Sequence, residues 1–530
     1  MFPKLGGHTI STKHPALKKS TLDKDLDKFV HLEEATGFLS RGFVLPGLGF
    51  LFIVLSGVVA AISVTGEPRA AFIVAATAIG AYMALNIGAN DVANNVGPAV
   101  GSRAMSITTA LLIAAVFESA GALIAGGDVV STISKGIIDP QTVSDPNVFI
   151  LAMMAALMSS ALWINLATWL GAPVSTTHAI VGGVMGAGIA TSGFGAVEWP
   201  IIGGIAASWV ISPLLGGVIA AAFLAFIKTF VVYRQDKIAA ARLWVPILIA
   251  IMTGSFSAYL AMKGVKKIIH LSPLVILLIG VAGCALGYFA AKPYIQRKSA
   301  GLPNRNQSLR RLFRLPLIIS AALLSFAHGA NDVANAIGPL AAIVHVAEFG
   351  AVTANVGIPI WVMMLGGLGI SFGLVVFGSR LIRMVGKQIT KLNPMRAYCV
   401  ALSAAITVII ASALGLPVSS THIAVGAVFG VGFFREWYTA NSRRRADYMA
   451  RKGHGQHRNK TAKPLKSNDY AYTRDMFVAD SAAVVGNPEA TRRKLVRRQH
   501  FISIVAAWII TVPAATLLSA LIFLAMQSLG

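Results

Sequence analysis

The chain has 530 residues, of which 55% are hydrophobic and only 12% charged, and its mean hydropathy is +0.71. These values exclude a soluble globular protein, which has about 25% charged residues, and predict a polytopic membrane protein. The net charge is +24, and the segment from Arg435 to His500 carries sixteen Lys/Arg against six Asp/Glu. Basic loops of membrane proteins face the cytoplasm and anionic lipid, so membrane lipid is the expected partner and nucleic acid is not.

The predicted elements begin with a polar cytoplasmic arm at 1–42 and an extra transmembrane helix at 43–64. This first apolar span comes too late, and is followed by too many others, for a cleaved signal peptide. A membrane-spanning helix needs about 20 apolar residues. The segments that meet this requirement are 43–64, 71–98, 105–125, 148–170, 200–228, 242–262, 271–291, 315–339, 358–382, 397–415 and 501–526.

Two shorter apolar segments, 174–190 and 418–434, follow their predecessors without a polar loop. Gly-x-Pro turns at Gly171 and Gly415 make the connections. Because these segments are too short to span a bilayer comfortably, we predict that they are the returning limbs of two re-entrant hairpins.

The distribution of loop charge then predicts the topology. The basic loops at 228–242, 292–314, 380–396 and 435–500 all lie inside only if each hairpin enters and leaves the membrane on one side. The N-terminus is then cytoplasmic and the C-terminus outside.

The expected fold is an all-α inverted-repeat membrane protein with about 9–12 crossing helices. Transport repeat 1 is predicted at 70–230, and linking helices with a basic loop at 231–312. Repeat 2 is predicted at 313–530, interrupted by the cytoplasmic loop 435–500.

One motif occurs in both halves, as GANDVANNVGP at 88–98 and as GANDVANAIGP at 329–339. It places Asp91 and Asp332 within long apolar runs. A carboxylate at that depth costs a few kcal/mol or more and is retained only where it faces a cavity, an ion or a partner. The repetition therefore predicts a polar site between two related halves.

A second motif starts each returning limb, as PVSTTHAIVG at 173–182 and PVSSTHIAVG at 417–426. Proline followed by Ser/Thr indicates a helix start, where hydroxyls and unpaired N–H groups can bind an anion. A third echo, SWVISP at 208–213 and AWIITVP at 507–513, supports duplication. Two such helix starts brought together could surround a tetrahedral oxyanion.

The aspartates fit beside an anion only if the anion carries a proton to donate or a cation lies between them. Phosphate keeps one or two protons at neutral pH, whereas sulfate keeps none. Asn and Asp oxygens, with carbonyls freed by broken helices, are also ligands suited to sodium. The residues alone therefore favour phosphate with a coupled cation.

The four motif copies, in this order and spacing, closely resemble the inorganic phosphate transporter (PiT) family, from about Ala70 to the C-terminus. The resemblance implies an inner-membrane secondary transporter that imports phosphate with sodium or, in some bacterial members, with protons. It implies a phosphate site at Asp91, Asn94, Ser175, Thr176, Thr177, Asp332, Asn335, Ser419, Ser420 and Thr421. It implies that sodium, the coupling metal ion, binds among Asn90, Asp91, Asn94, Glu118, Asn331, Asp332 and Asn335.

Several residues fit this scheme less directly. Glu118 resembles an acidic position of the family, but its expected second-half counterpart, near Pro359, is not acidic. His178 and His422 are candidates for a proton relay, or alternatively for hydrogen bonds that orient the hairpins. His328 precedes the second motif where the first half has Ile87, and we interpret it as a packing or capping residue.

The alternatives are a proton-coupled symporter of phosphate or of a metal–phosphate complex and, less favoured, a sulfate permease. An intramembrane hydrolase would need a nucleophile with an oriented base, which the sequence does not mark. A receptor or scaffold would leave the buried aspartates unexplained. No P-loop occurs, so we expect a transporter that is not an enzyme and has no tightly bound cofactor. The sequence also allows the chain to form a homodimer.

Overall fold

A computed structural model describes residues 44–67, 69–135, 137–138, 142–143, 145–172, 174–264, 271–350, 357–388, 392–442 and 498–529. The predicted arm at 1–42 lies outside these residues, as does most of the basic segment 435–500. The chain divides into two units, Met1–Phe50 and Leu51–Gly530. All contacts given below lie within the second unit.

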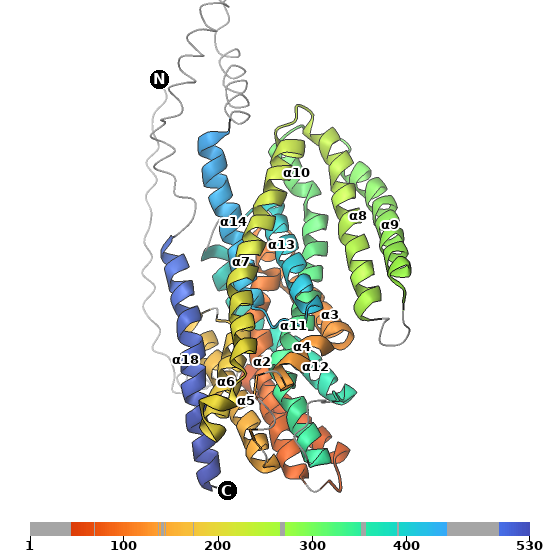
Figure 1. Cartoon of the computed structure of the whole chain (residues 1–530). Helices are drawn as coiled ribbons and strands as arrows, with labels where there is room; N and C mark the ends of the chain where they lie inside the picture. The colour runs from red at the N-terminus through yellow and green to blue at the C-terminus, as the bar shows by residue number, and fades with distance from the viewer. Residues whose placement is uncertain are drawn as a thin grey trace, which may run out of the picture. The chain divides into compact units, whose positions relative to one another are not determined.

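The described residues are almost entirely helical (Figure 1), and eleven of their helices are long and apolar enough to cross a membrane. The first is Val44–Ser63. The first half continues with α2 (Ala70–Gly101), α3 (Ile107–Ala125), α4 (Gly127–Lys135), α5 (Pro146–Leu170), α6 (Thr176–Ser192) and α7 (Trp199–Ile227). A π-helical turn, η2 (Lys228–Val232), follows α7.

Three helices join the halves, and α8 and α9 of these lie side by side (Figure 1). They are α8 (Lys237–Lys263), α9 (Pro273–Ser299) and α10 (Asn306–Leu312). The second half has α11 (Arg314–Phe349), α12 (Ile360–Gln388), α13 (Pro394–Ala413), α14 (Ser420–Asn441) and α18 (Arg498–Leu529). Every predicted spanning segment therefore has its helix.

The two predicted hairpin turns are formed by the residues that the sequence indicates. Gly171 and Gly415 have φ values of 74° and 70°, a left-handed conformation that favours glycine and ends the incoming helix. Ser175 and Ser419 then cap α6 and α14, because each side-chain oxygen accepts a hydrogen bond from the backbone N–H three residues later. The second motif is thus a helix start in both halves, as predicted.

The aspartate motifs lie in continuous helices, so the expectation of broken helices at this point is wrong. Helices α2 and α11 run through Pro98 and Pro339, and α11 continues to Phe349. A proline inside a helix cannot donate to the carbonyl four residues earlier, which here belongs to Asn94 or Asn335. The neighbouring turns keep their own hydrogen bonds, so the helix persists.

Equivalent helix contacts recur in the two halves. Helix α2 packs on α12 as α11 packs on α3, and α2 and α11 also contact each other. Helix α6 packs on α18 of the second half, while α14 packs on α7 of the first half. Each hairpin helix is thus held by the other half, which agrees with duplication. The inverted orientation and the re-entrant path stay predictions.

The first glycine of each aspartate motif allows a close backbone contact. A Cβ on Gly88 would overlap the carbonyl oxygen of Ile370 in α12, and one on Gly329 would overlap that of Glu118 in α3. Because these contacts are equivalent, Ile370 is the counterpart of Glu118. The expectation that this counterpart lies near Pro359 is wrong. The stretch of chain between the aspartate motif and the next helix is longer in the second half, because α11 continues to Phe349 and α12 begins only at Ile360.

Candidate functional site

Asp91 is fully buried and receives a hydrogen bond from each hairpin helix. Thr176 of α6 donates its hydroxyl to Oδ2 at 2.9 Å, and Thr421 of α14 donates to Oδ1 at 2.8 Å. A carboxylate held by charge-assisted bonds from two hydroxyls is well suited to a buried site. Asp91 therefore joins the hairpin of its own half to that of the other half.

Asp332 is equally buried, and its hydrogen-bond donors come from the second half alone. Ser420 of α14 donates its hydroxyl to Oδ2 at 2.8 Å, and the Asn331 side-chain amide donates to Oδ1 at 2.6 Å. The same amide also donates to the Val418 carbonyl at 2.7 Å. Asp332 is thus fixed to its own helix and its own hairpin.

The motif asparagines Asn94 and Asn335 hold the hairpin hydroxyls from the opposite half. Asn94 Nδ2 donates to Thr421 Oγ1 at 2.8 Å, and Asn335 Nδ2 lies 3.2 Å from the hydroxyls of both Thr176 and Thr177. Thr177 in turn donates to the backbone carbonyl of Val418 at 3.0 Å. The structure therefore brings these predicted site residues into one hydrogen-bonded set.

His328 lies among three buried carboxylates, so its interpretation as a packing or capping residue is wrong. Its Nε2 is 2.8 Å from Asp332 Oδ2 and 3.7 Å from Asp91 Oδ2, and its Nδ1 is 3.4 Å from Glu118 Oε1. The signal in the sequence is the spacing of four residues between His328 and Asp332, which places both on one face of a helix.

Glu118 is fully buried beside this set, and its Oε1 accepts a hydrogen bond of 2.8 Å from the Asn95 amide. Asn95 was not among the predicted site residues, although it directly follows Asn94 in the motif. We call Asn95, Glu118 and His328 the polar cluster. Glu118 Oε2 and Asn95 Oδ1 have no hydrogen-bond partner in the described part of the chain, so they are oxygens with ligand capacity to spare.

Three other predicted residues make more local contacts. Asn90 donates to Thr168 Oγ1 of α5 at 2.8 Å, and its own Oδ1 is buried without a partner among the described residues. The Ser175 and Ser419 oxygens accept from the N–H groups of His178 and His422, at 3.1 and 3.2 Å. These two serines therefore act first as helix caps.

His178 and His422 form the middle of a row of four rings. Their centroids are 4.3 Å apart, and each imidazole also lies against a tryptophan, Trp209 at 3.8 Å and Trp508 at 3.7 Å. No hydrogen-bond partner of the four imidazole nitrogens is found in the described ranges. The contacts thus favour a packing role between the hairpins, and the proton relay stays a prediction without a hydrogen-bonded path.

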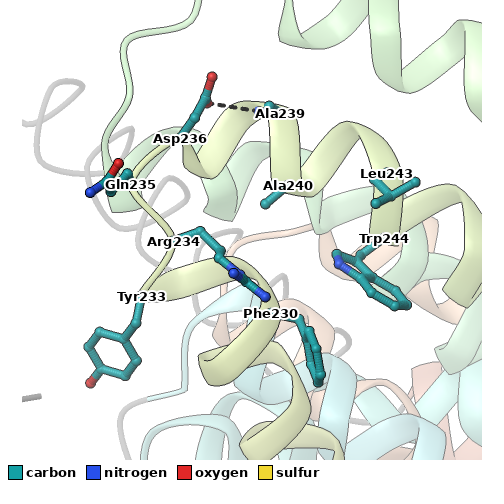
Figure 2. Close-up of a pocket in the computed structure, with 9 residues that line it drawn as sticks. All are labelled: Phe230, Tyr233, Arg234, Gln235, Asp236, Ala239, Ala240, Leu243 and Trp244. Atoms are coloured by element: carbon teal, nitrogen blue, oxygen red, sulfur yellow. Dashed lines mark hydrogen bonds between the residues drawn. The ribbon is translucent and has the colours of Figure 1, made fainter. Parts of the chain in front are cut away.

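A separate pocket of about 720 Å³ lies at the turn between α7 and α8 (Figure 2). Its walls combine the aromatic rings of Phe230, Tyr233 and Trp244 with the charged groups of Arg234 and Asp236. Asp236 Oδ1 accepts hydrogen bonds from the backbone N–H groups of Ile238 and Ala239 at the start of α8. None of the nine lining residues belongs to the hydrogen-bonded set around Asp91 and Asp332, so this pocket is not part of that site.

The fold and the site define a class of protein. Many spanning helices surround a buried set of carboxylates, amides and hydroxyls drawn from both halves, which is how transporters build a substrate site within the membrane. Asp91, His328 and Asp332 each offer a ligand atom within 4.8 Å of the others, so a cation can be held there. The arrangement is that of a multi-pass membrane transporter.

Comparison with known proteins identifies the family. The model of the phosphate transporter family matches residues 87–519. Proteins named "Putative phosphate permease" from two Helicobacter pylori strains are each 44% identical to this chain, over 93% and 95% of it and 97% and 98% of their own length. A Pyrococcus horikoshii protein of that description is 41% identical over 67% of this chain and 87% of its own. The chain belongs to the phosphate transporter family, and it is a transporter, not an enzyme.

A solved structure agrees with this assignment. It is titled "The sodium-dependent phosphate transporter" and superposes with a TM-score of 0.72 at 32% identity. The match covers 87% of this chain and all of that one. The similarity therefore extends to the fold as well as to the sequence.

Proposed function

We propose that this chain imports inorganic phosphate by sodium symport as a secondary active transporter. Family membership and the sodium-dependent structural relative support the proposal. The observation that carries it is the use of the hairpin hydroxyls. Thr176 and Thr421 donate to Asp91, and Ser420 donates to Asp332, so the donors that an anion needs are bonded to the carboxylates that a cation needs.

This arrangement suggests how the two ligands are coupled. A sodium ion that binds a carboxylate neutralises its charge and replaces the hydroxyl hydrogen bonds. The released hydroxyls, together with the N-termini of α6 and α14, can then donate to phosphate oxygens. Without sodium, phosphate would be repelled by the negative carboxylates, and the hydroxyl donors would still be hydrogen-bonded to those carboxylates. The affinities of the two ligands should therefore be reciprocally coupled.

The oxygens available to sodium come from the motif residues of both halves. We assign sodium coordination to side chains among Asn90, Asp91, Asn94, Glu118, Asn331, Asp332 and Asn335. The carbonyls of Asn94 and Asn335 add to this set, because Pro98 and Pro339 cannot donate the helical hydrogen bond to them. Phosphate contacts are assigned to the hydroxyls and amides at Asn94, Ser175, Thr176, Thr177, Asn335, Ser419, Ser420 and Thr421, with Asp91 and Asp332 accepting its protons.

Transport requires that this site open alternately to each side. We infer that the two hairpin-containing halves rock as inverted repeats about the buried site, with the N-terminus and the loop 435–500 on the cytoplasmic face of the inner membrane. Helix α6 packs against α18 and α14 packs against α7, so each half contacts the hairpin helix of the other half. A movement of one half therefore displaces donors on both sides of the site.

A second candidate is symport of a divalent metal–phosphate complex with protons. The set of Asp91, His328 and Asp332, with ligand atoms within 4.8 Å of one another, favours it, because imidazole with carboxylates suits a transition metal. Sodium-driven uptake that requires no divalent metal would exclude this candidate.

The test is uptake of radiolabelled phosphate by the purified chain in proteoliposomes. We expect uptake driven by an inward sodium gradient that a large excess of sulfate does not inhibit. Uptake driven by a pH gradient without sodium would replace the proposal with the proton-coupled alternative. Inhibition by equimolar sulfate would contradict the role given to the aspartates as acceptors of phosphate protons.

A further inference from the structure

The two halves of the site differ in polarity where the polar cluster of Asn95, Glu118 and His328 has an apolar counterpart. The motif alignment pairs Asn95 with Ala336 and His328 with Ile87, and the glycine contacts pair Glu118 with Ile370. All three counterparts are buried hydrophobic residues of one core cluster. The asymmetry is thus concentrated at three equivalent positions that lie beside the aspartates.

This difference coincides with a difference in hydrogen bonding at the hairpins. Thr421 and Thr177 are equivalent residues of α14 and α6, and each accepts from the motif asparagine of the opposite half. Thr421 donates its hydroxyl across the halves to Asp91. By symmetry Thr177 would donate to Asp332, yet it donates to the Val418 carbonyl instead.

The surroundings of Asp332 account for this exception. Its Oδ2 is contacted by Ser420 and by His328, both at 2.8 Å, and its Oδ1 receives the Asn331 amide. The Asn331 amide thus takes the oxygen equivalent to the one that Thr421 holds on Asp91, and the His328 imidazole lies against the other oxygen beside Ser420. With both oxygens contacted, the Thr177 hydroxyl finds a backbone acceptor instead. At Asp91 the same imidazole is 3.7 Å away, so its close contact is with Asp332 alone of the two aspartates.

We propose that His328 is a positioning residue that, together with the Asn331 amide, holds Asp332 in place of Thr177, which makes the two aspartates unequal. Asp332 is fixed within the second half, and the Thr177 hydroxyl is released to tie α6 to the turn before α14. Asp91 remains the carboxylate that both hairpins share. The proposal rests on the proposed phosphate–sodium symport and concerns how its site is held.

The test is a double-mutant cycle in sodium-driven phosphate uptake by proteoliposomes, with His328→Leu, Thr177→Val and the pair. Without the imidazole, Asp332 should recruit the Thr177 hydroxyl, so Thr177→Val should be more harmful in the His328→Leu background. We expect each single variant to raise the KM for phosphate about tenfold. The pair should exceed the product of the two by at least about fivefold, because the compensating donor is lost as well.

Two further variants separate this role from a loss of packing. His328→Gln keeps an amide donor near the position of Nε2 and should restore a KM within about threefold of wild type. Ser325→Ala removes a buried hydroxyl of α11 that has no partner in the described structure, and it should combine with Thr177→Val multiplicatively.

A multiplicative result for His328→Leu with Thr177→Val would overturn the inference, as would failure of the glutamine to restore uptake. If the leucine variant is not monodisperse, the same cycle with His328→Asn applies, since its shorter side chain also falls short of Asp332. A wild-type chain that takes up no phosphate with sodium would instead contradict the proposed function, so the two failures are distinguishable.

Discussion

Thr421→Val is the substitution that best distinguishes one site shared by the two halves of the protein from two independent sites, one in each half. The Thr421 hydroxyl donates to Asp91 and accepts from Asn94, both at 2.8 Å, and both partners belong to the opposite half. Valine has nearly the same shape but removes both bonds. A hydrogen bond to a charged group contributes about 1.5–3 kcal/mol and a neutral one about 1 kcal/mol, so the site should lose about 2–4 kcal/mol.

A loss of that size predicts that kcat/KM for sodium-driven phosphate uptake falls at least about 30-fold. Thr407→Val is the matched control, because the Thr407 hydroxyl is also buried in the second half but donates to the Ser403 carbonyl of its own helix, at 2.9 Å, and to no other group among the described residues. This control should change kcat/KM less than about threefold. Equal effects of the two substitutions would refute the cross-half role of Thr421.

Three further results are expected. Gly88→Ala should abolish monodisperse protein in size-exclusion chromatography, because its Cβ would overlap the Ile370 carbonyl. Gly97→Ala should not, because its Cβ would meet nothing within 4 Å in the described structure; similar behaviour of both would refute the close helix contact. Asp332→Asn should lower the rate of sodium-driven phosphate uptake at least about tenfold by removing an anionic sodium ligand, and a wild-type rate and affinity would refute the ligand assignment. A cysteine placed within 443–497 of a chain without its two native cysteines should not react with an impermeant thiol reagent in intact cells, and rapid labelling would reverse the proposed orientation.

Much of the fold could be predicted because the features that determine it are local and repeated. Apolar length located the eleven spanning helices, and the Gly-x-Pro turns with Ser175 and Ser419 located the starts of α6 and α14. The convergence of Asp91 with Asp332 followed from duplication, since a costly carboxylate that occurs twice indicates one site between the halves. These inferences needed only residue type and order.

The errors arose where the two halves differ or where tertiary contacts override a local rule. The predicted segments 71–98 and 315–339 stop at the motif prolines, yet α2 and α11 continue through them. The register of α12 depends on how far α11 extends, which motif spacing does not reveal. His328 was undervalued because Ile87 is its counterpart, although a residue without a symmetric partner is where one half can gain a separate role.

We propose that sodium releases hairpin hydroxyls from Asp91 and Asp332 so that these hydroxyls can bind phosphate. The most direct test is the Kd of the purified protein for phosphate, measured by calorimetry in sodium and in choline at equal ionic strength. Phosphate should bind at least about tenfold more tightly in sodium, and phosphate should tighten sodium binding by the same factor. Equal phosphate affinity in sodium and in choline would contradict it.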